Sequence, residues 1–163
     1  MGRCGVNRVI LCSVVLLCML CACTAREVPP DADRVSPRPK DIPPGLIVRS
    51  IDGDESVDII ATMGTYSWDY GTGGVEADAL HPLDMEDIAT IADVPQKIEL
   101  VFTGQVIGYT VDRWVKGAGY EDYDTVKPEG NTITPPDDGK SHVYEVTVEY
   151  TNGIVHYAFK VNK

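Results

Sequence analysis

The stretch "HVYEVTVEYTNGIVHYAFKVNK", residues 142–163, alternates apolar and polar side chains on both sides of Asn152-Gly153. A period of two places apolar side chains on one face of a strand, and Asn-Gly is a strong signal for a tight hairpin turn. We therefore expect two antiparallel strands, each with one buried and one solvated face. The side chains expected to be buried are Tyr144, Val146, Val148 and Tyr150 before the turn, and Val155, Tyr157, Phe159 and Val161 after it.

Other apolar runs predict further strands upstream. "GLIVRSI" (45–51) and "SVDIIATM" (56–63) flank "DGDE" and predict a second hairpin. A third pair of runs is "KIELVFT" (97–103) and "QVIGYTVDRWV" (105–115), and in the first of them Ile98, Leu100 and Phe102 are expected to point inward.

Helical periodicity is almost absent from the chain. Only "LDMEDIATIA" (83–92) allows a short helical turn, in a loop bounded by Pro82 and Pro95. Many short strands separated by Gly- and Pro-containing turns predict an all-β fold. The number of strands, about seven, favours an immunoglobulin-like β-sandwich, with Trp114 as its candidate core tryptophan.

The stretch "MGTYSWDYGTGG" (63–74) carries the most conspicuous aromatic residues. Tyr66, Trp68 and Tyr70 lie two residues apart and therefore share one face of a strand. The apolar phase changes from odd to even numbers at Gly64, which predicts a bulge, a bend or a break there, as in a strand that changes sheets. The three rings either fill the core or form a platform for sugar rings. The uniformly polar opposite face favours burial.

The composition restricts the class of partner. The chain has 14 basic and 25 acidic residues and a net charge of −11. Without Arg3 and Arg8, 12 basic residues face 25 acidic ones, a net charge of −13. We do not expect nucleic acid binding, because no basic patch is available to neutralise phosphates.

All five cysteines lie before residue 24. Arg3 and Arg8 precede an apolar run from Val9 to Cys21, which is typical of an export signal over residues 1–22. Leu20-Cys21-Ala22-Cys23 resembles the bacterial lipobox. The resemblance implies cleavage before Cys23, lipid on its sulfur, and anchoring to the extracytoplasmic face of the cell membrane. No cysteine then remains for disulfides or thiol catalysis.

Residues 23–44 contain six prolines and no apolar periodicity. Such a segment favours extended polyproline geometry and predicts a tether. Residues 45–163 remain for one folded domain.

A second resemblance rests on "GTYSW" (64–68), followed by a Gly-containing turn, Asp78 and Pro82. This pattern is similar to small extracytoplasmic β-domains of Gram-positive bacteria. They occur in lipoproteins and outside the membrane portion of some sensor-type metalloproteases. The similarity extends to residues 97–102 and the final strands. It implies a location and a fold, and it carries no catalytic residue.

Candidate sites for metals and catalysis have simpler interpretations. "DGDESVD" (52–58) has alternating carboxylates but lacks the glutamate that closes a calcium loop, so a hairpin turn explains it better. "GYEDYD" (119–124) predicts an exposed acidic loop, and the alternative is a weak calcium site, because carboxylates on a loop are suitable ligands for this ion. His142 and His156 could meet across the final hairpin, but we expect no metal site, no cofactor and no catalytic residues.

We therefore expect a lipid-anchored, non-catalytic binding or interaction module. Its partner would be a membrane protein or a cell-wall component. One alternative is a carbohydrate- or peptidoglycan-binding module that uses the aromatics around Trp68. A second alternative is a hydrolase whose paired carboxylates are distant in sequence and meet in space.

Overall fold

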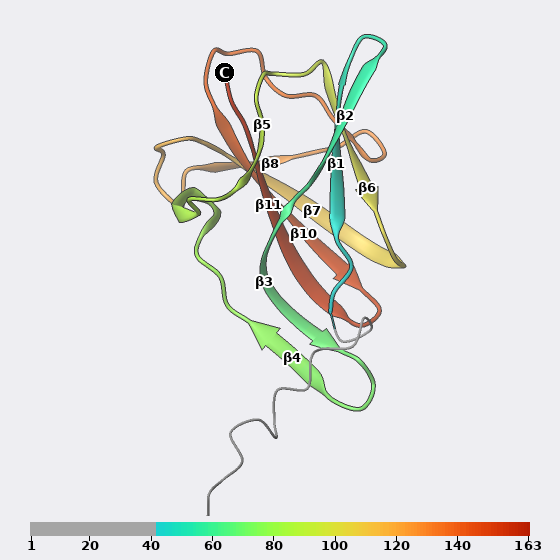
Figure 1. Ribbon diagram of the computed structural model, residues 1–163. Helices are drawn as coiled ribbons and strands as arrows, with labels where there is room; N and C mark the ends of the chain where they lie inside the picture. The colour runs from blue at the N-terminus through green and yellow to red at the C-terminus, as the bar shows by residue number, and fades with distance from the viewer. Residues whose placement is uncertain (1–41) are drawn as a thin grey trace, which may run out of the picture. The chain divides into compact units, whose positions relative to one another are not determined.

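The computed structural model describes residues 42–163, which form two antiparallel sheets packed face to face (Figure 1). This arrangement confirms the all-β sandwich. The four-stranded sheet has the order β2-β1-β6-β9, and the larger sheet has the order β4-β3-β11-β10-β7-β8, with β5 parallel to part of β11. The strands are β1 Leu46–Asp52, β2 Glu55–Ile60, β3 Thr62–Asp69, β4 Gly74–Ala77, β5 Ala89–Ile91, β6 Lys97–Phe102, β7 Val106–Val115, β8 Tyr123–Val126, β9 Thr132–Ile133, β10 His142–Tyr150 and β11 Gly153–Val161.

The C-terminal hairpin is confirmed as the centre of the larger sheet. β10 and β11 pair without interruption from His142↔Val161 to Tyr150↔Gly153. All eight side chains that the alternation assigns to the interior are buried. Gly153 is required because an added Cβ would lie 1.9 Å from the carbonyl oxygen of Ser67, on the neighbouring strand β3. The glycine therefore permits close packing of a third strand.

The hairpin of β1 and β2 is also confirmed, from Ile47↔Ile60 to Asp52↔Glu55. The third pair of apolar runs, which forms β6 and β7, does not form a hairpin. β6 pairs with β1 and β9, whereas β7 pairs with β10 and β8, so the two runs lie in different sheets. Gly104 allows the crossing, because its φ of 111° is one that other residues rarely adopt.

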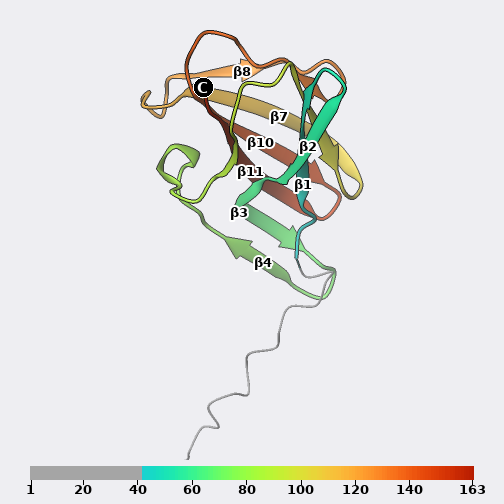
Figure 2. The same ribbon diagram turned by 45° about the horizontal axis from the view of Figure 1, so that its top comes forward.

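The phase change near Gly64 has two structural causes. β2 belongs to the smaller sheet and β3 to the larger one, so the chain changes sheets at Ala61. The register between β11 and β3 then shifts, from Val155↔Tyr66 to Tyr157↔Met63, which is a bulge on β3. In Figure 2, β1 and β2 lie across β7, β10 and β11, and β3 continues from β2 into the larger sheet.

The segment 83–92 contains helical structure only at its start and is extended at its end. A single 3₁₀ turn spans Pro82–Asp84, and Ala89–Ile91 is strand β5. The backbone N–H of Ala89 donates to Oγ1 of Thr62 at 2.8 Å, which holds the segment in an extended form beside β11. A tertiary contact thus outweighs the local preference.

The core lies between the two sheets and includes Leu46, Val48, Ile98 and Leu100 from the smaller one. The structure has eleven strands among the described residues instead of about seven, because β4, β5, β8 and β9 are short additional strands. Trp114 is buried, with 4% of its surface exposed. It lies on the outer face of the larger sheet, opposite to the core residue Val111, so it is not a tryptophan between the sheets.

Candidate functional site

The aromatic residues singled out in the sequence do not form an exposed platform. Trp68 is only 9% exposed, and its ring packs edge-on against Tyr150, with ring centroids 5.6 Å apart. Tyr66 is half-buried against the same core, and Tyr70 is half-buried beyond the end of β3. These side chains follow the inward phase that the bulge at Gly64 sets. Cys23, the candidate lipidation site, lies outside the described residues.

His142 and His156, which could have met across the final hairpin, do not meet. In the hairpin register His142 pairs with Val161 and His156 pairs with Thr147, so the two imidazoles lie at different places along the strands. His142 is 2% exposed, and its Nε2 lies 3.0 Å from the carboxylate of Asp138. His156 instead lies on the outer face of the larger sheet.

An open groove of about 350 Å³ lies over this outer face. Its floor comes from β3, β10 and β11, and its rim comes from the segment that joins β4 to β5. Its volume is near the lower end of the range for sites that bind small molecules or single side chains. We call it the outer groove. It is lined by Gly64, Thr65, Ala79, Leu80, His81, Pro82, Met85, Glu145, His156, Tyr157 and Ala158.

His156 and Glu145 at the floor of the outer groove form a polar triplet with Thr147, which lies beside them. Nδ1 of His156 is 3.3 Å from Oε1 of Glu145 and 3.2 Å from Oγ1 of Thr147. The three residues come from the paired strands β10 and β11, whose register places Thr147 opposite His156. The side chain of His156 is one-third exposed, so it is accessible to a ligand in the groove.

Four rings form an aromatic cluster beside the outer groove: His81, Trp114, Tyr120 and Tyr123. His81 stacks on Tyr120 with centroids 4.3 Å apart and meets Trp114 edge-on at 5.2 Å. Trp114 contacts Tyr123 at 5.4 Å. Tyr120 and Tyr123 are 52% and 48% exposed, so the cluster presents ring surface to solvent.

Hydrogen bonds fix the geometry of the aromatic cluster. Nε1 of Trp114 donates to the carbonyl oxygen of Tyr120 at 2.8 Å, and the backbone N–H of Leu83 donates to Nδ1 of His81 at 3.2 Å. The hydroxyl of Tyr120 donates to the carboxylate of Asp84, and this bond raises the pKa of Tyr120. The rings are therefore held in place before any partner binds, which lowers the entropy lost on binding.

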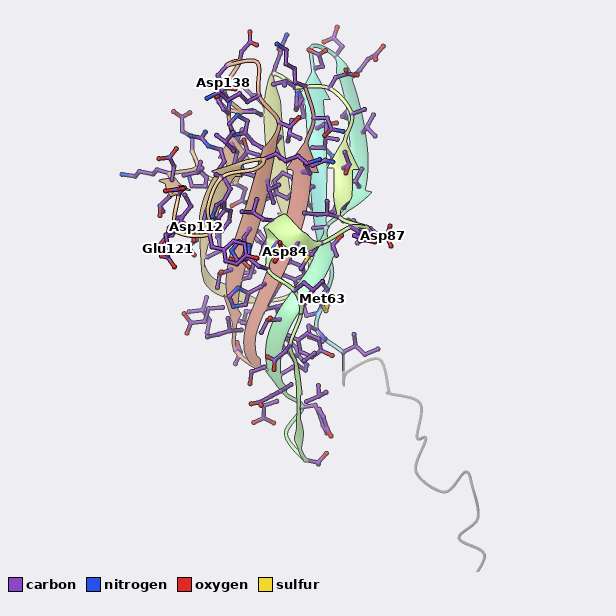
Figure 3. All side chains as sticks on the ribbon, turned by 90° about the vertical axis from the view of Figure 1, so that its left-hand side faces the viewer. Met63, Asp84, Asp87, Asp112, Glu121 and Asp138 are labelled. Atoms are coloured by element: carbon purple, nitrogen blue, oxygen red, sulfur yellow. The ribbon has the colours of Figure 1, made fainter. Side chains whose placement is uncertain are left out.

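The domain that carries the aromatic cluster is acidic. The described domain has 21 acidic and eight basic residues. Figure 3 shows Asp84 over the middle of the larger sheet, with Asp112 and Glu121 toward its left side. Among residues 42–163, no three His, Cys, Asp or Glu side chains lie close enough together to hold a metal ion.

The alternating carboxylates of residues 52–58 lie on the hairpin of β1 and β2. Asp52 and Glu55 flank its turn, and the carboxylate of Asp58 binds the guanidinium of Arg49 at 2.7 and 3.1 Å. That ion pair lowers the pKa of Asp58. A structural role therefore accounts for these residues.

Sequence reasoning missed the aromatic cluster and the histidine–glutamate pair. Their members come from the segment before the 3₁₀ turn, from β7, from the loop after β7, from β8 and from the final hairpin. No local spacing brings these segments together. The available signal was the pair of tyrosines in "GYEDYD", since tyrosines in a polar loop are frequently contact residues.

Fold and site together define the described part of the chain as an all-β sandwich with an acidic, aromatic outer face. Comparisons with protein-family models, with curated proteins and with solved structures found no match to this chain. Within residues 42–163 there is no helix with the length and apolarity needed to cross a bilayer.

Proposed function

We propose that this chain is a lipid-anchored extracytoplasmic binding module that catalyses no reaction. In this proposal Cys23 carries the lipid, residues 23–44 act as the tether, and the sandwich contacts a membrane protein or a cell-wall component. The end of the tether is held on the sandwich, since Pro43 is buried and the carbonyl oxygen of Pro44 accepts a hydrogen bond from Tyr157. The lipobox resemblance supports the anchor, and the proline content supports the tether.

The observation that carries the binding role is the aromatic cluster. Exposed tyrosines supported by a buried tryptophan are typical of the residues that contribute most to protein interfaces. Here Trp114, Tyr120 and His81 are locked by hydrogen bonds, and Tyr120 and Tyr123 remain about half exposed. Anchoring would raise the local concentration of this surface near a membrane partner.

The experiment that tests the proposal measures binding of the purified full chain to solubilised membranes and to cell-wall fractions. Tyr120→Ala and Tyr123→Ala should each weaken binding at least about tenfold, because hot-spot truncations cost about 2 kcal/mol or more. The matched control is Ile107→Ser, which removes a residue that is 63% exposed and lies about 23 Å along β7 from Trp114. Equal binding by wild type and both tyrosine variants would contradict the proposal.

The same preparation should be assayed against hydrolase substrates, with and without calcium and zinc. His156 and Glu145 form the pair with the geometry of a general base and its partner. We expect no turnover. Turnover that His156→Ala abolishes while the fold is retained would replace the binding proposal with an enzymatic one.

A further inference from the structure

The edge of the smaller sheet ends in an exposed strand. β2 pairs with β1 on one side, and no described strand pairs with its other side. Val57 and Ile60 are 63% and 72% exposed, which makes β2 the most solvent-accessible strand with apolar side chains among residues 42–163. This surface lies on the other sheet from the outer groove.

The hydrogen-bond pattern shows which backbone groups of β2 are free. The N–H of Ala61 donates to the carbonyl oxygen of Leu46 at 2.9 Å, next to the registered pair Ile47↔Ile60. Antiparallel pairs alternate between bonded and non-bonded, so Ile59, Val57 and Glu55 direct their backbone groups toward β1. The N–H and C=O groups of Ser56, Asp58 and Ile60 consequently point away from the sheet.

β2 differs from the other sheet edges in length. β4 and β8 have four residues each and β9 has two, and β8 runs directly into Lys127 and Pro128. Short length, charged side chains, proline and bulges are the usual devices that prevent an edge from pairing with another chain. β2 pairs with β1 over six residues in a regular register and contains no lysine or proline. Its charged residues, Glu55 and Asp58, oppose pairing with another acidic strand, so an edge of this length is suited to receive a basic strand.

A groove of about 390 Å³ runs along the same edge, between β2 and residues 90–95. Val57, Ile59 and Ile91 supply its apolar surface. Asp52, Glu55 and Asp93 supply carboxylates, and no lysine or arginine is among the described residues that line it. A strand added to β2 would direct every second side chain toward this groove.

We propose that the free edge of β2 binds an extended segment of a partner protein that carries lysine or arginine at alternate positions. Backbone bonds to Ser56, Asp58 and Ile60 would supply affinity, and the groove carboxylates would select basic side chains. A second copy of this chain fits poorly, because it would bring Glu55 and Asp58 against the same acidic strand. The proposal is independent of lipidation and of the outer groove.

The test uses the full chain in detergent and hydrogen exchange measured at single amides. The probe is an eight-residue peptide that alternates lysine and valine, and the control peptide has glutamate in place of lysine. We expect the lysine peptide to slow exchange at Ser56, Asp58 and Ile60 at least tenfold, with a much smaller change at Val57 and Ile59. No slowing at the first three amides, or equal slowing by both peptides, would overturn the proposal. Slowing that grows with chain concentration without peptide would identify a second copy instead.

A pair of variants tests the edge itself. Ser56→Pro removes a donor that faces the free edge, and edge positions are where a strand tolerates proline. Ser56→Ala is its control. We expect Ser56→Pro to bind the lysine peptide at least tenfold more weakly, while the amides of Val57 and Ile59 stay protected. Binding equal to that of Ser56→Ala would contradict the proposal.

A variant with altered charges gives a clear result even if Ser56→Pro destabilises the hairpin of β1 and β2. Asp52→Asn, Glu55→Gln and Asp93→Asn together keep the backbone edge and remove the groove carboxylates. We expect this variant to bind the lysine peptide at least tenfold more weakly and to lose the preference over the glutamate peptide. An unchanged preference would overturn the proposal.

Discussion

Replacing Trp68 with alanine tests whether this residue is a core residue or part of a binding surface. Burying an aromatic side chain removes about 150–250 Å² from water. At about 25 cal/mol per Å², this corresponds to an upper limit of about 4–6 kcal/mol. Because Trp68 is 9% exposed and packs edge-on against Tyr150, Trp68→Ala should cost about 3–5 kcal/mol, as other buried aromatic truncations do. The 122 described residues correspond to a total stability of about 6–18 kcal/mol.

The assay is urea unfolding followed by the fluorescence of Trp114, which remains as the only other tryptophan of the chain. Ile107→Ala is the control, because an exposed truncation usually changes stability by less than about 0.5 kcal/mol. A loss of less than about 1 kcal/mol for Trp68→Ala, together with lost binding to glycan, would refute the burial argument. It would restore the platform interpretation of Tyr66, Trp68 and Tyr70.

Further predictions concern substitutions at Tyr157, Gly153 and Cys23. Tyr157→Phe should cost about 1–2 kcal/mol, because the buried hydroxyl of Tyr157 donates to the carbonyl oxygen of Pro44. Burial raises the pKa of Tyr157 above 10.0, so the contribution of this hydroxyl to stability is constant below that pH and falls as pH rises above it. Unfolding at pH 8 and pH 11 should therefore show a smaller loss of stability for Tyr157→Phe than for the wild type. Gly153→Ala should lower the urea midpoint more than Gly117→Ala does, since only at Gly153 would the new Cβ meet a backbone oxygen at 1.9 Å. Cys23→Ala should abolish labelling by fatty acid, and labelling that persists there but vanishes in Cys21→Ala would move the cleavage site.

The elements that could be predicted are those whose pairing is local. The hairpins of β1–β2 and β10–β11 each have a period of two around a short turn, and nothing between their strands competes with that pairing. The partners of β6 and β7 could not be predicted from adjacency, because the chain crosses between sheets at Gly104. Likewise, β5 is a strand because of β11 and Thr62, which are distant in sequence from residues 83–92.

The candidate site was less predictable than the fold for the same reason. His81 and Tyr120 lie 39 positions apart in the sequence and stack only after the sheet has formed. The burial of Trp68 was predictable, because its alternation with polar neighbours is local and the bulge at Gly64 corrects the phase. The alternation of apolar and polar residues predicts which face of a sheet a side chain lies on, but it does not predict which loops cover that face. Trp114 lies on the outer face of the larger sheet and is nevertheless buried.

The most direct test of the binding role places a photo-crosslinking amino acid at position 123 of the full chain in intact cells. We expect a discrete crosslinked product from position 123 that is lost when Tyr120→Ala is added. Position 107 serves as the control, since it is more exposed than position 123 and distant from the aromatic cluster. A product from position 123 alone would support a partner at the outer face. No product from position 123, or the same product from both positions, would contradict it.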